Sequence, residues 1–123
     1  MEEIWKDIPG YEGLYQASNF GNIRRIMFCN QYGSISKITS VKTYDTEKGY
    51  LRVFLCKNGV KKAFCVHRLI ALTFLPNINN YSEINHIDFN RHNNSINNLE
   101  WCDHSYNINY SKLNNRYKQK EVN

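Results

Sequence analysis

The fold of this 123-residue chain is constrained most by the stretch GYLRVFLCKNGVKKAFCV, residues 49–66. Two runs rich in β-branched and aromatic residues flank Asn58-Gly59, and this dipeptide is the strongest short marker of a β-hairpin with a type I′ turn. Alternation along the first run places Leu51, Val53 and Leu55 on one face of the strand, with Arg52 and Phe54 on the opposite face. The chain is therefore expected to contain an antiparallel sheet.

Strands joined by turns are also predicted before this hairpin. Residues 14–17 and 23–26 predict two short strands around the turn SNFGN, because Asn and Gly supply the backbone conformations that such turns need. After the hairpin, the apolar spacing of VHRLIALTFLP changes to a helical one. This change predicts a short, mostly buried helix that ends at Pro76.

The chain from residue 83 onward predicts the order strand, loop, strand and helix. The expected elements are a strand at 83–87, a loop at 88–94, a helical turn capped by Ser95, a strand at 99–102 and a helix from Asp103. The helix starts acidic and ends basic, as the helix macrodipole favours. Its residues available for packing are Tyr106, Ile108, Tyr110 and Leu113. This order can bring side chains from three elements to one point.

Charge is unevenly distributed along the chain. Residues 20–75 hold ten Lys or Arg and two acidic residues, whereas residues 81–110 hold one Arg and four acidic residues. The basic front half favours a polyanion partner, and a solvated basic face is the alternative. For Arg68 and its neighbour His67, structural packing is an equal alternative. Our candidates for phosphate contacts are Arg24, Arg25, Arg52, Lys61, Lys62 and Arg68.

Several classes of protein are disfavoured by composition. The chain has no run of about 18 apolar residues, and its first ten residues lack the apolar core of a secretory signal. We therefore expect a soluble, intracellular protein with one domain, or with one small domain and an appendage. The cysteines are scattered without C-x-x-C spacing, which predicts reduced, buried thiols and no structural zinc. They are Cys29, Cys56, Cys65 and Cys102.

The stretch that indicates chemistry is EINHIDFNRHNNSINNLEW, residues 83–101, in which His86 lies close to many amide side chains. A neutral imidazole can accept a proton from water near pH 7. Amide oxygens and water are hard ligands that suit Mg²⁺ or Mn²⁺, and such an ion stabilises charge on a phosphate. The number of asparagines itself is given no weight, because an A·T-rich genome can produce it.

At three stretches the chain resembles phage and intron-encoded homing-type endonucleases. Their HNH motif, also called the ββα-metal or His-Me finger motif, is similar to INHIDFNRHNNSINNLEWCDHSYNIN. The helix before that motif is similar to VHRLIALTFLPN, and the small N-terminal nuclease-associated module is similar to IWKDIPGYEGLYQASNFGNIRRI. The resemblance implies an α+β fold, with an N-terminal antiparallel β-sheet module at residues 1–62. A ββα-metal nuclease core with a C-terminal helix follows at residues 63–123.

The resemblance also implies a role for four residues. His86 matches the general base that activates water, and Asn98 matches the central asparagine that holds the loop and helps to orient the histidine strand. Asn107 matches the metal ligand on the helix, and Asn85 falls where many members carry aspartate as a second ligand. We expect one divalent ion, Mg²⁺ or Mn²⁺. Because an amide at position 85 removes one negative charge, Asn85→Asp is expected to keep or raise activity.

Each of these assignments has a plainer alternative. His86 could be a core histidine, Asn98 could cap a turn, and Asn107 could be a solvent-facing helix residue. We expect His92 and His104 to be loop or surface residues.

The function implied by the resemblance is metal-dependent hydrolysis of DNA phosphodiester bonds, as a nick or a double-strand cut. The expected partner is double-stranded DNA, and the expected state is a monomer, with a dimer as the alternative. The expected location is the cytoplasm of a bacterial host, if the protein is phage-encoded. A DNA-binding regulator built on a catalytically weakened HNH scaffold is the rival that Asn85 favours. A structural or protein-binding domain is the second rival, for which the basic half would be incidental.

Overall fold

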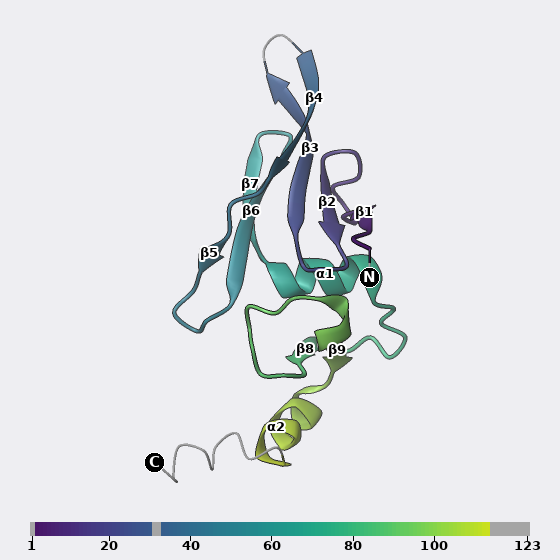
Figure 1. Cartoon of the computed structure of the whole chain (residues 1–123), viewed down its shortest axis with the longest axis vertical. Helices are drawn as coiled ribbons and strands as arrows, with labels where there is room; N and C mark the ends of the chain where they lie inside the picture. Colours follow the sequence, from purple (N-terminus) through teal and green to yellow (C-terminus); the bar gives the residue numbers. More distant parts are fainter. Residues whose placement is uncertain (1, 31–32, 114–123) are drawn as a thin grey trace.

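The computed structural model describes residues 2–30 and 33–113, and this part contains three antiparallel sheets (Figure 1). The first sheet has the strand order β1 (Trp5–Asp7), β2 (Tyr15–Ser18), β3 (Ile23–Asn30) and β4 (Gly33–Ser40). The second sheet consists of β5 (Tyr44–Asp45), β6 (Leu51–Lys57) and β7 (Val60–Cys65). The third sheet consists of β8 (Glu83–His86) and β9 (Leu99–Cys102). The helices are α1 (Val66–Phe74), the single 3₁₀ turn η1 (Ile96–Asn98) and α2 (His104–Leu113). The predicted α+β class with an N-terminal antiparallel module is confirmed.

The β6–β7 hairpin has the predicted turn. Asn58 and Gly59 both have positive φ, at 52° and 76°, as a type I′ turn requires. Val53 and Leu55 are fully buried, whereas Arg52 is exposed on the other face of the strand. The alternation in the sequence therefore gave the correct strand face.

Helix α1 lies between the two larger sheets and the small β8–β9 sheet (Figure 1) and contacts all three. One apolar core runs through these contacts, from Ile8 in the N-terminal region to Leu99 in β9. Leu69 and Ile70 of α1 are buried in it, but Leu72 is half exposed on the outer side of the helix. The prediction of a mostly buried helix before Pro76 is confirmed, with Leu72 as the exception.

The predicted order of elements after residue 83 is also observed, with a different packing of the last helix. Of the four residues expected to pack, Leu113 is 82% exposed and Tyr106 is 45% exposed. Tyr110 does pack on Phe89, and Ile108 lines a pocket beside β8 together with the polar Asn107 and the buried Ser111. The helix begins where Asp103 Oδ1 accepts a hydrogen bond from Tyr106 N at 2.7 Å. Lys112 lies in its last described turn, and the other basic residues of its expected end lie outside the described residues.

Two further expectations concern the surface and the thiols. No helix within residues 2–30 and 33–113 is long and apolar enough to cross a membrane. Cys56 and Cys65 are partly buried free thiols, and burial raises the pKa of the buried Cys102 to about 11. The side chain of Cys29 lies outside the described residues.

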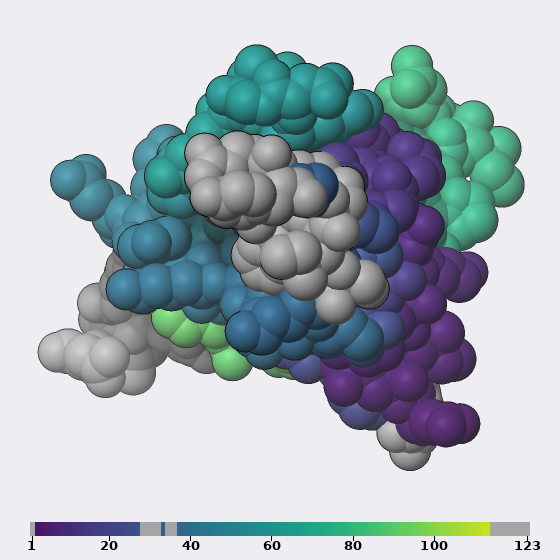
Figure 2. All heavy atoms as spheres, turned by 90° about the horizontal axis from the view of Figure 1, so that it is seen from above, coloured from purple at the N-terminus to yellow at the C-terminus, as the bar shows by residue number. Residues whose placement is uncertain are grey.

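Figure 2 shows the end of the molecule opposite α2, where the N-terminal strands and the β6–β7 hairpin lie on opposite sides.

Candidate active site

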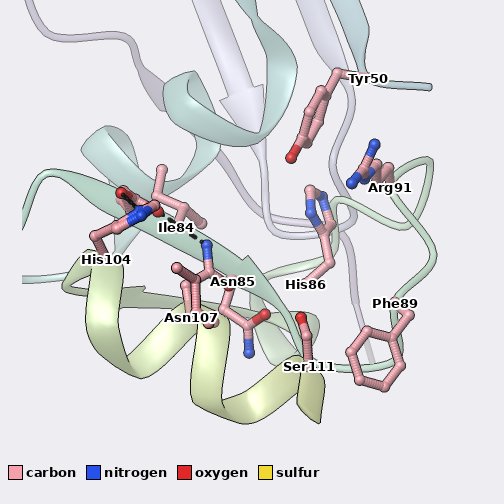
Figure 3. A pocket seen from close by; sticks show the side chains of 11 residues that line it. Tyr50, Ile84, Asn85, His86, Phe89, Arg91, His104, Asn107 and Ser111 are labelled. Atoms are coloured by element: carbon pink, nitrogen blue, oxygen red, sulfur yellow. Dashed lines mark hydrogen bonds and ion pairs between the residues drawn. The ribbon is translucent and has the colours of Figure 1, made fainter. Parts of the chain in front are cut away.

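A pocket between β8 and α2 brings together three of the four residues predicted for the nuclease site (Figure 3). These are Asn85 and His86 at the end of β8 and Asn107 on α2. The cavity has a volume of about 170 Å³, and Asn85 and His86 are only 5% and 6% exposed. Its other lining residues are Tyr50, Glu83, Ile84, Phe89, Arg91, His104, Ile108 and Ser111. The fourth predicted residue, Asn98, does not line this pocket.

The ring of His86 is oriented by Asn94, which is buried in the loop between β8 and η1. His86 Nε2 lies 2.8 Å from Asn94 Oδ1. Because an amide oxygen only accepts, this contact assigns the ring proton to Nε2 and makes Nδ1 the basic nitrogen of the neutral ring. The arrangement provides a proton acceptor of fixed orientation.

Two further aromatic rings lie beside His86. The ring centroid of His67, on α1, lies 5.1 Å from that of His86, and the Tyr50 centroid lies 6.0 Å away. His67 is 9% exposed, and its Nδ1 is buried without a hydrogen-bond partner. Burial, followed by the proximity of His86, lowers the pKa of His67 to about 3. His67 is therefore neutral at physiological pH and packs in the structure, rather than contacting phosphate.

Arg91 extends the pocket toward the surface. Its guanidinium lies 4.6 Å from the ring centroid of Tyr50 and donates to the backbone carbonyl of Lys48. A guanidinium held in this way presents fixed positive charge at the pocket edge, suited to a phosphate.

Asn98 acts through the loop and not in the pocket. Its Oδ1 accepts from Asp88 N at 2.9 Å, and its Nδ2 donates to Asp88 Oδ1 at 2.8 Å and to Asn93 O at 2.9 Å. Hydrogen bonds from Asn93 and Asn98 hold the pKa of Asp88 below its usual value. Asn98 therefore closes the loop that carries Asn94, and its amide is fully used there.

Both amides predicted as metal ligands donate to glutamates. Asn85 Nδ2 donates to Glu100 Oε1 at 2.9 Å, and Asn107 Nδ2 donates to Glu83 Oε1 at 3.1 Å. The Asn107 amide and the nearby His104 ring hold the pKa of Glu83 below its usual value. In the described part of the chain, no three His, Cys, Asp or Glu side chains gather as metal ligands. The pocket lining nevertheless offers the amide oxygens of Asn85 and Asn107 and the carboxylate of Glu83, and oxygen ligands suit a hard divalent cation.

The turn between β2 and β3 supports the loop behind His86. Asn19 O accepts from Ile96 N at 3.0 Å and lies 3.4 Å from Ser95 Oγ, so Ser95 bonds this turn instead of capping η1. Gly21 has φ +92°, and a Cβ there would lie 2.7 Å from the carbonyl carbon of Asn94. The N-terminal region thus contacts the residue that orients His86.

The basic candidates do not form one surface. Arg24 and Arg25 are successive residues of β3, so their side chains leave opposite faces of the sheet. Arg24 lies over the Trp5 ring at 4.1 Å and bonds Gln16, whereas Arg25 donates to Met27 O. Arg68 donates to Ser82 O, so its guanidinium also has a packing role.

The β6–β7 hairpin separates its own basic residues in the same way. In the strand register Lys61 is opposite Cys56 and Lys62 is opposite the buried Leu55. Cross-strand partners share a face, so Lys61 lies on the outward face with Arg52, and Lys62 lies on the other.

The sequence did not single out several residues that line the pocket or contact its lining residues. Glu83 lies two residues before Asn85 on the same strand face, and Glu100 is opposite Asn85 in the register. Both could have been found by aligning the two predicted strands. Asn94 could have been noticed as a loop amide near His86, but no periodicity or spacing places His67 or Tyr50 beside it.

Both histidines expected to be loop or surface residues, His92 and His104, are exposed. His92 is exposed and pairs with Asp45 at 3.1 Å. His104 is also exposed, but it lines the pocket and bonds Glu83 at 2.8 Å.

Comparison with known proteins identifies two regions. A family model described as the NUMOD4 motif matches residues 3–56, and one described as HNH endonuclease matches residues 64–109.

Three relatives share parts of this sequence. DNA endonuclease I-HmuI of Bacillus phage SP01 is 38% identical over 104 residues, which cover 85% of this chain and 55% of that protein. Two uncharacterized HNH endonucleases of Acanthamoeba polyphaga mimivirus are 54% identical over 54 residues and 37% identical over 121 residues. These alignments cover 44% and 92% of this chain but 16% and 27% of the two relatives. The chain thus spans about half of I-HmuI and less of the other two.

A solved structure of the HNH homing endonuclease I-HmuI, which concerns DNA binding and cleavage, has the same fold. It matches with a TM-score of 0.75 and 32% sequence identity, over 99% of this chain and 66% of that chain. The two family regions follow each other in the order that the sequence predicts, and the shared fold extends over nearly the whole described chain. The chain therefore belongs to the HNH endonuclease family, with a NUMOD4 motif before its HNH region.

Proposed function

We propose that this chain is a divalent-metal-dependent endonuclease of the homing type that hydrolyses phosphodiester bonds in double-stranded DNA. The observation that carries the proposal is the pocket in which His86, oriented by Asn94 at 2.8 Å, lies beside Asn85 and Asn107. The DNA binding and cleavage described for I-HmuI, a relative with the same fold, supports it.

His86 is the general base in this proposal. With Nε2 donating to Asn94, Nδ1 takes the proton of a water molecule that attacks the phosphorus atom. Asn85 and Asn107 would hold one Mg²⁺ or Mn²⁺ through their amide oxygens. When bound, such an ion stabilises negative charge on the phosphate and its leaving oxygen. Arg91, at the pocket edge, supplies a further positive charge toward the phosphate.

The remaining parts of the chain position the duplex. Residues 1–62 form a DNA-binding module and residues 63–123 form the nuclease core, which agrees with the family matches at 3–56 and 64–109. Exposed cations such as Arg52 and Lys61 contact phosphates without reading sequence. The protein acts as a monomer in this proposal.

Plasmid nicking by the full chain tests the proposal. Supercoiled DNA should be converted to the nicked or linear form with Mg²⁺ or Mn²⁺, and EDTA should abolish the conversion. The matched control is His92→Ala, which removes an exposed histidine outside the pocket and should leave cleavage unchanged. DNA binding with no cleavage under any metal would refute the nuclease and favour the DNA-binding regulator.

A further inference from the structure

The amides of Asn85 and Asn107 each bond a carboxylate that the proposed reaction does not use: Glu83 lines the pocket, and Glu100 lies beside it. Asn85 donates to Glu100 across the β8–β9 pair at 2.9 Å. Asn107 donates from α2 to Glu83 on β8 at 3.1 Å. Each amide in the proposed metal site therefore has its own glutamate, and the two pairs come from different elements.

Glu100 is held in place from both sides. The β8–β9 register sets Glu100 directly opposite Asn85, so the two side chains share one face of the small sheet. The same carboxylate oxygen accepts from Tyr106 OH on α2 at 3.1 Å. Asn85 thus faces a carboxylate with a fixed position, and not one that can turn away into solvent.

A carboxylate determines which way each amide points. An ionised carboxylate only accepts hydrogen bonds, so the Nδ2 group of Asn85 or Asn107 must face its glutamate. Rotating either amide by 180° would bring its oxygen against the carboxylate, which is repulsive. The Oδ1 atom is therefore the atom that each amide can offer to a cation.

We propose that Glu83 and Glu100 are positioning residues of the metal site. They orient the Asn107 and Asn85 amides with Oδ1 available as the ligand atom, and they supply negative charge that two neutral amides lack. This inference rests on the proposed function, because it takes the two amides as metal ligands. Asn85 is then the fitted partner of Glu100 and not a weakened substitute for aspartate.

The pairing predicts an unusual outcome at position 85. A carboxylate there would meet Glu100 at about hydrogen-bond distance, and two ionised carboxylates at that distance repel each other unless they share a proton. The charge that Asn85→Asp brings to the cation is therefore opposed by Glu100. Replacing Glu100 by glutamine removes that repulsion and provides an amide donor for the new carboxylate. When Asn85 is present, the same replacement only removes negative charge that Glu100 supplies to the metal site.

Mn²⁺ titration calorimetry on the full chain tests this, with melting temperatures to show that each variant is folded. Glu100→Gln should weaken Mn²⁺ binding about 10-fold when Asn85 is present, the lower end of the effect of removing partners of metal ligands. In the Asn85→Asp background, Glu100→Gln should instead strengthen Mn²⁺ binding. Glu83→Gln should weaken binding in both backgrounds, since its partner is Asn107. The charge-matched control is Glu12→Gln, in the exposed turn between β1 and β2, which should change neither.

The outcomes separate this inference from the proposed function. A reversal of sign for Glu100→Gln between the two backgrounds supports the inference. If Glu100→Gln changes Mn²⁺ binding in the same direction in both backgrounds, or in neither, the inference is overturned. The proposed function is retained in that case if the native chain binds Mn²⁺ and nicks DNA. A native chain that neither binds Mn²⁺ nor nicks DNA overturns both.

Discussion

The NUMOD4 region at residues 3–56 and the HNH region at residues 64–109 differ in what holds them together. The first contains the four-stranded sheet and strands β5 and β6 of the second sheet, and its core residues, such as Val53 and Leu55, are apolar and fully buried. The second has two strands of four residues each, and much of its buried interior is polar. Its buried amides are Asn85, Asn94 and Asn98.

This difference indicates that cleavage depends on the buried polar residues of the HNH region. An apolar core tolerates exchanges of similar volume, whereas a buried amide network loses stability when any member is left without a partner. The network of the HNH region directs the His86 ring through Asn94 and closes the loop through Asn98. We therefore expect mutations in the network to change cleavage, and mutations on the sheets to change stability or DNA binding.

The largest expected effect is that of His86→Ala. General-base assistance is typically worth about 10²–10⁴ in rate, so cleavage should fall by roughly that factor. DNA affinity should be retained, because the phosphate contacts lie elsewhere. Nicking rate, DNA affinity and melting temperature are to be measured on the same preparation.

Because His86 is buried, a second variant separates catalysis from packing. His86→Gln keeps a polar side chain of similar size, so it should fold and bind DNA while remaining inactive. Full activity in either folded variant would remove His86 from catalysis. Parallel loss of stability, binding and cleavage in both variants would instead indicate a core histidine.

Much of the fold could be predicted because strands and turns follow local rules. The Asn58-Gly59 turn, the buried face through Val53 and the strand at residues 99–102 all depend on neighbours in the sequence. The packing of α2 could not be predicted in this way. One of its contacts with β8 is the hydrogen bond from Asn107 to Glu83, which apolar spacing does not predict, and Leu113 remains exposed.

Three residues that line the pocket were named from the sequence, but their hydrogen-bond partners were not. The family resemblance gave His86, Asn85 and Asn107, which line one pocket. Amides elsewhere in the stretch were given no weight, yet Asn94 is the residue that orients His86. Composition alone cannot distinguish an amide that closes a loop from one that faces solvent. The difference depends on which buried polar groups of the folded chain still need a hydrogen-bond partner.

The second prediction tests whether the two regions act as one unit. Gly21→Ala places a Cβ 2.7 Å from the Asn94 carbonyl carbon, at a φ of +92° that side chains rarely adopt. Stability should fall by about 2 kcal/mol or more, and cleavage should fall further than DNA affinity because Asn94 must shift. Chemical unfolding, nicking and DNA binding are the measurements.

Gly10→Ala is the matched control for this prediction. Gly10 has a similar φ of +85°, but a Cβ there meets nothing within 4 Å. The control should lose about 1 kcal/mol to backbone strain and keep its cleavage rate. Equal effects of the two substitutions on cleavage would show that the contact between the β2–β3 turn and Asn94 does not influence the active site.

The third prediction concerns the buried ring of His67. Its pKa is lowered from 6.5 to about 3, so the unfolded chain binds a proton that the native state does not. Stability from this residue is complete above pH 6.5 and is lost as the pH falls toward 3. The loss between pH 6.5 and pH 5 should be about 2 kcal/mol. That interval lies above the range in which the carboxylates titrate.

His67→Phe should remove this part of the pH dependence while keeping a ring beside His86. Urea unfolding at several pH values measures it. The exposed His92 provides the control variant His92→Ala, which should keep the native slope. If His67→Phe and the native chain lose stability equally between these pH values, His67 is not held neutral by burial.

The smallest expected effect is that of replacing a single lysine on the β6–β7 hairpin. It tests which face of the hairpin contacts DNA. Lys61 and Lys62 are neighbours with the same charge on opposite faces, and Lys61 shares the outward face with Arg52. If that face meets the duplex, Lys61→Ala should lower the slope of log affinity against log salt by about 0.9, the contribution of one phosphate contact. Lys62→Ala should leave the slope near its native value, although both variants change the net charge equally. Affinity for an unrelated duplex, measured over a series of salt concentrations, gives both slopes. Equal slopes for the two variants would mean that the region attracts DNA through its overall charge, and the reverse order would place the duplex on the face of Lys62.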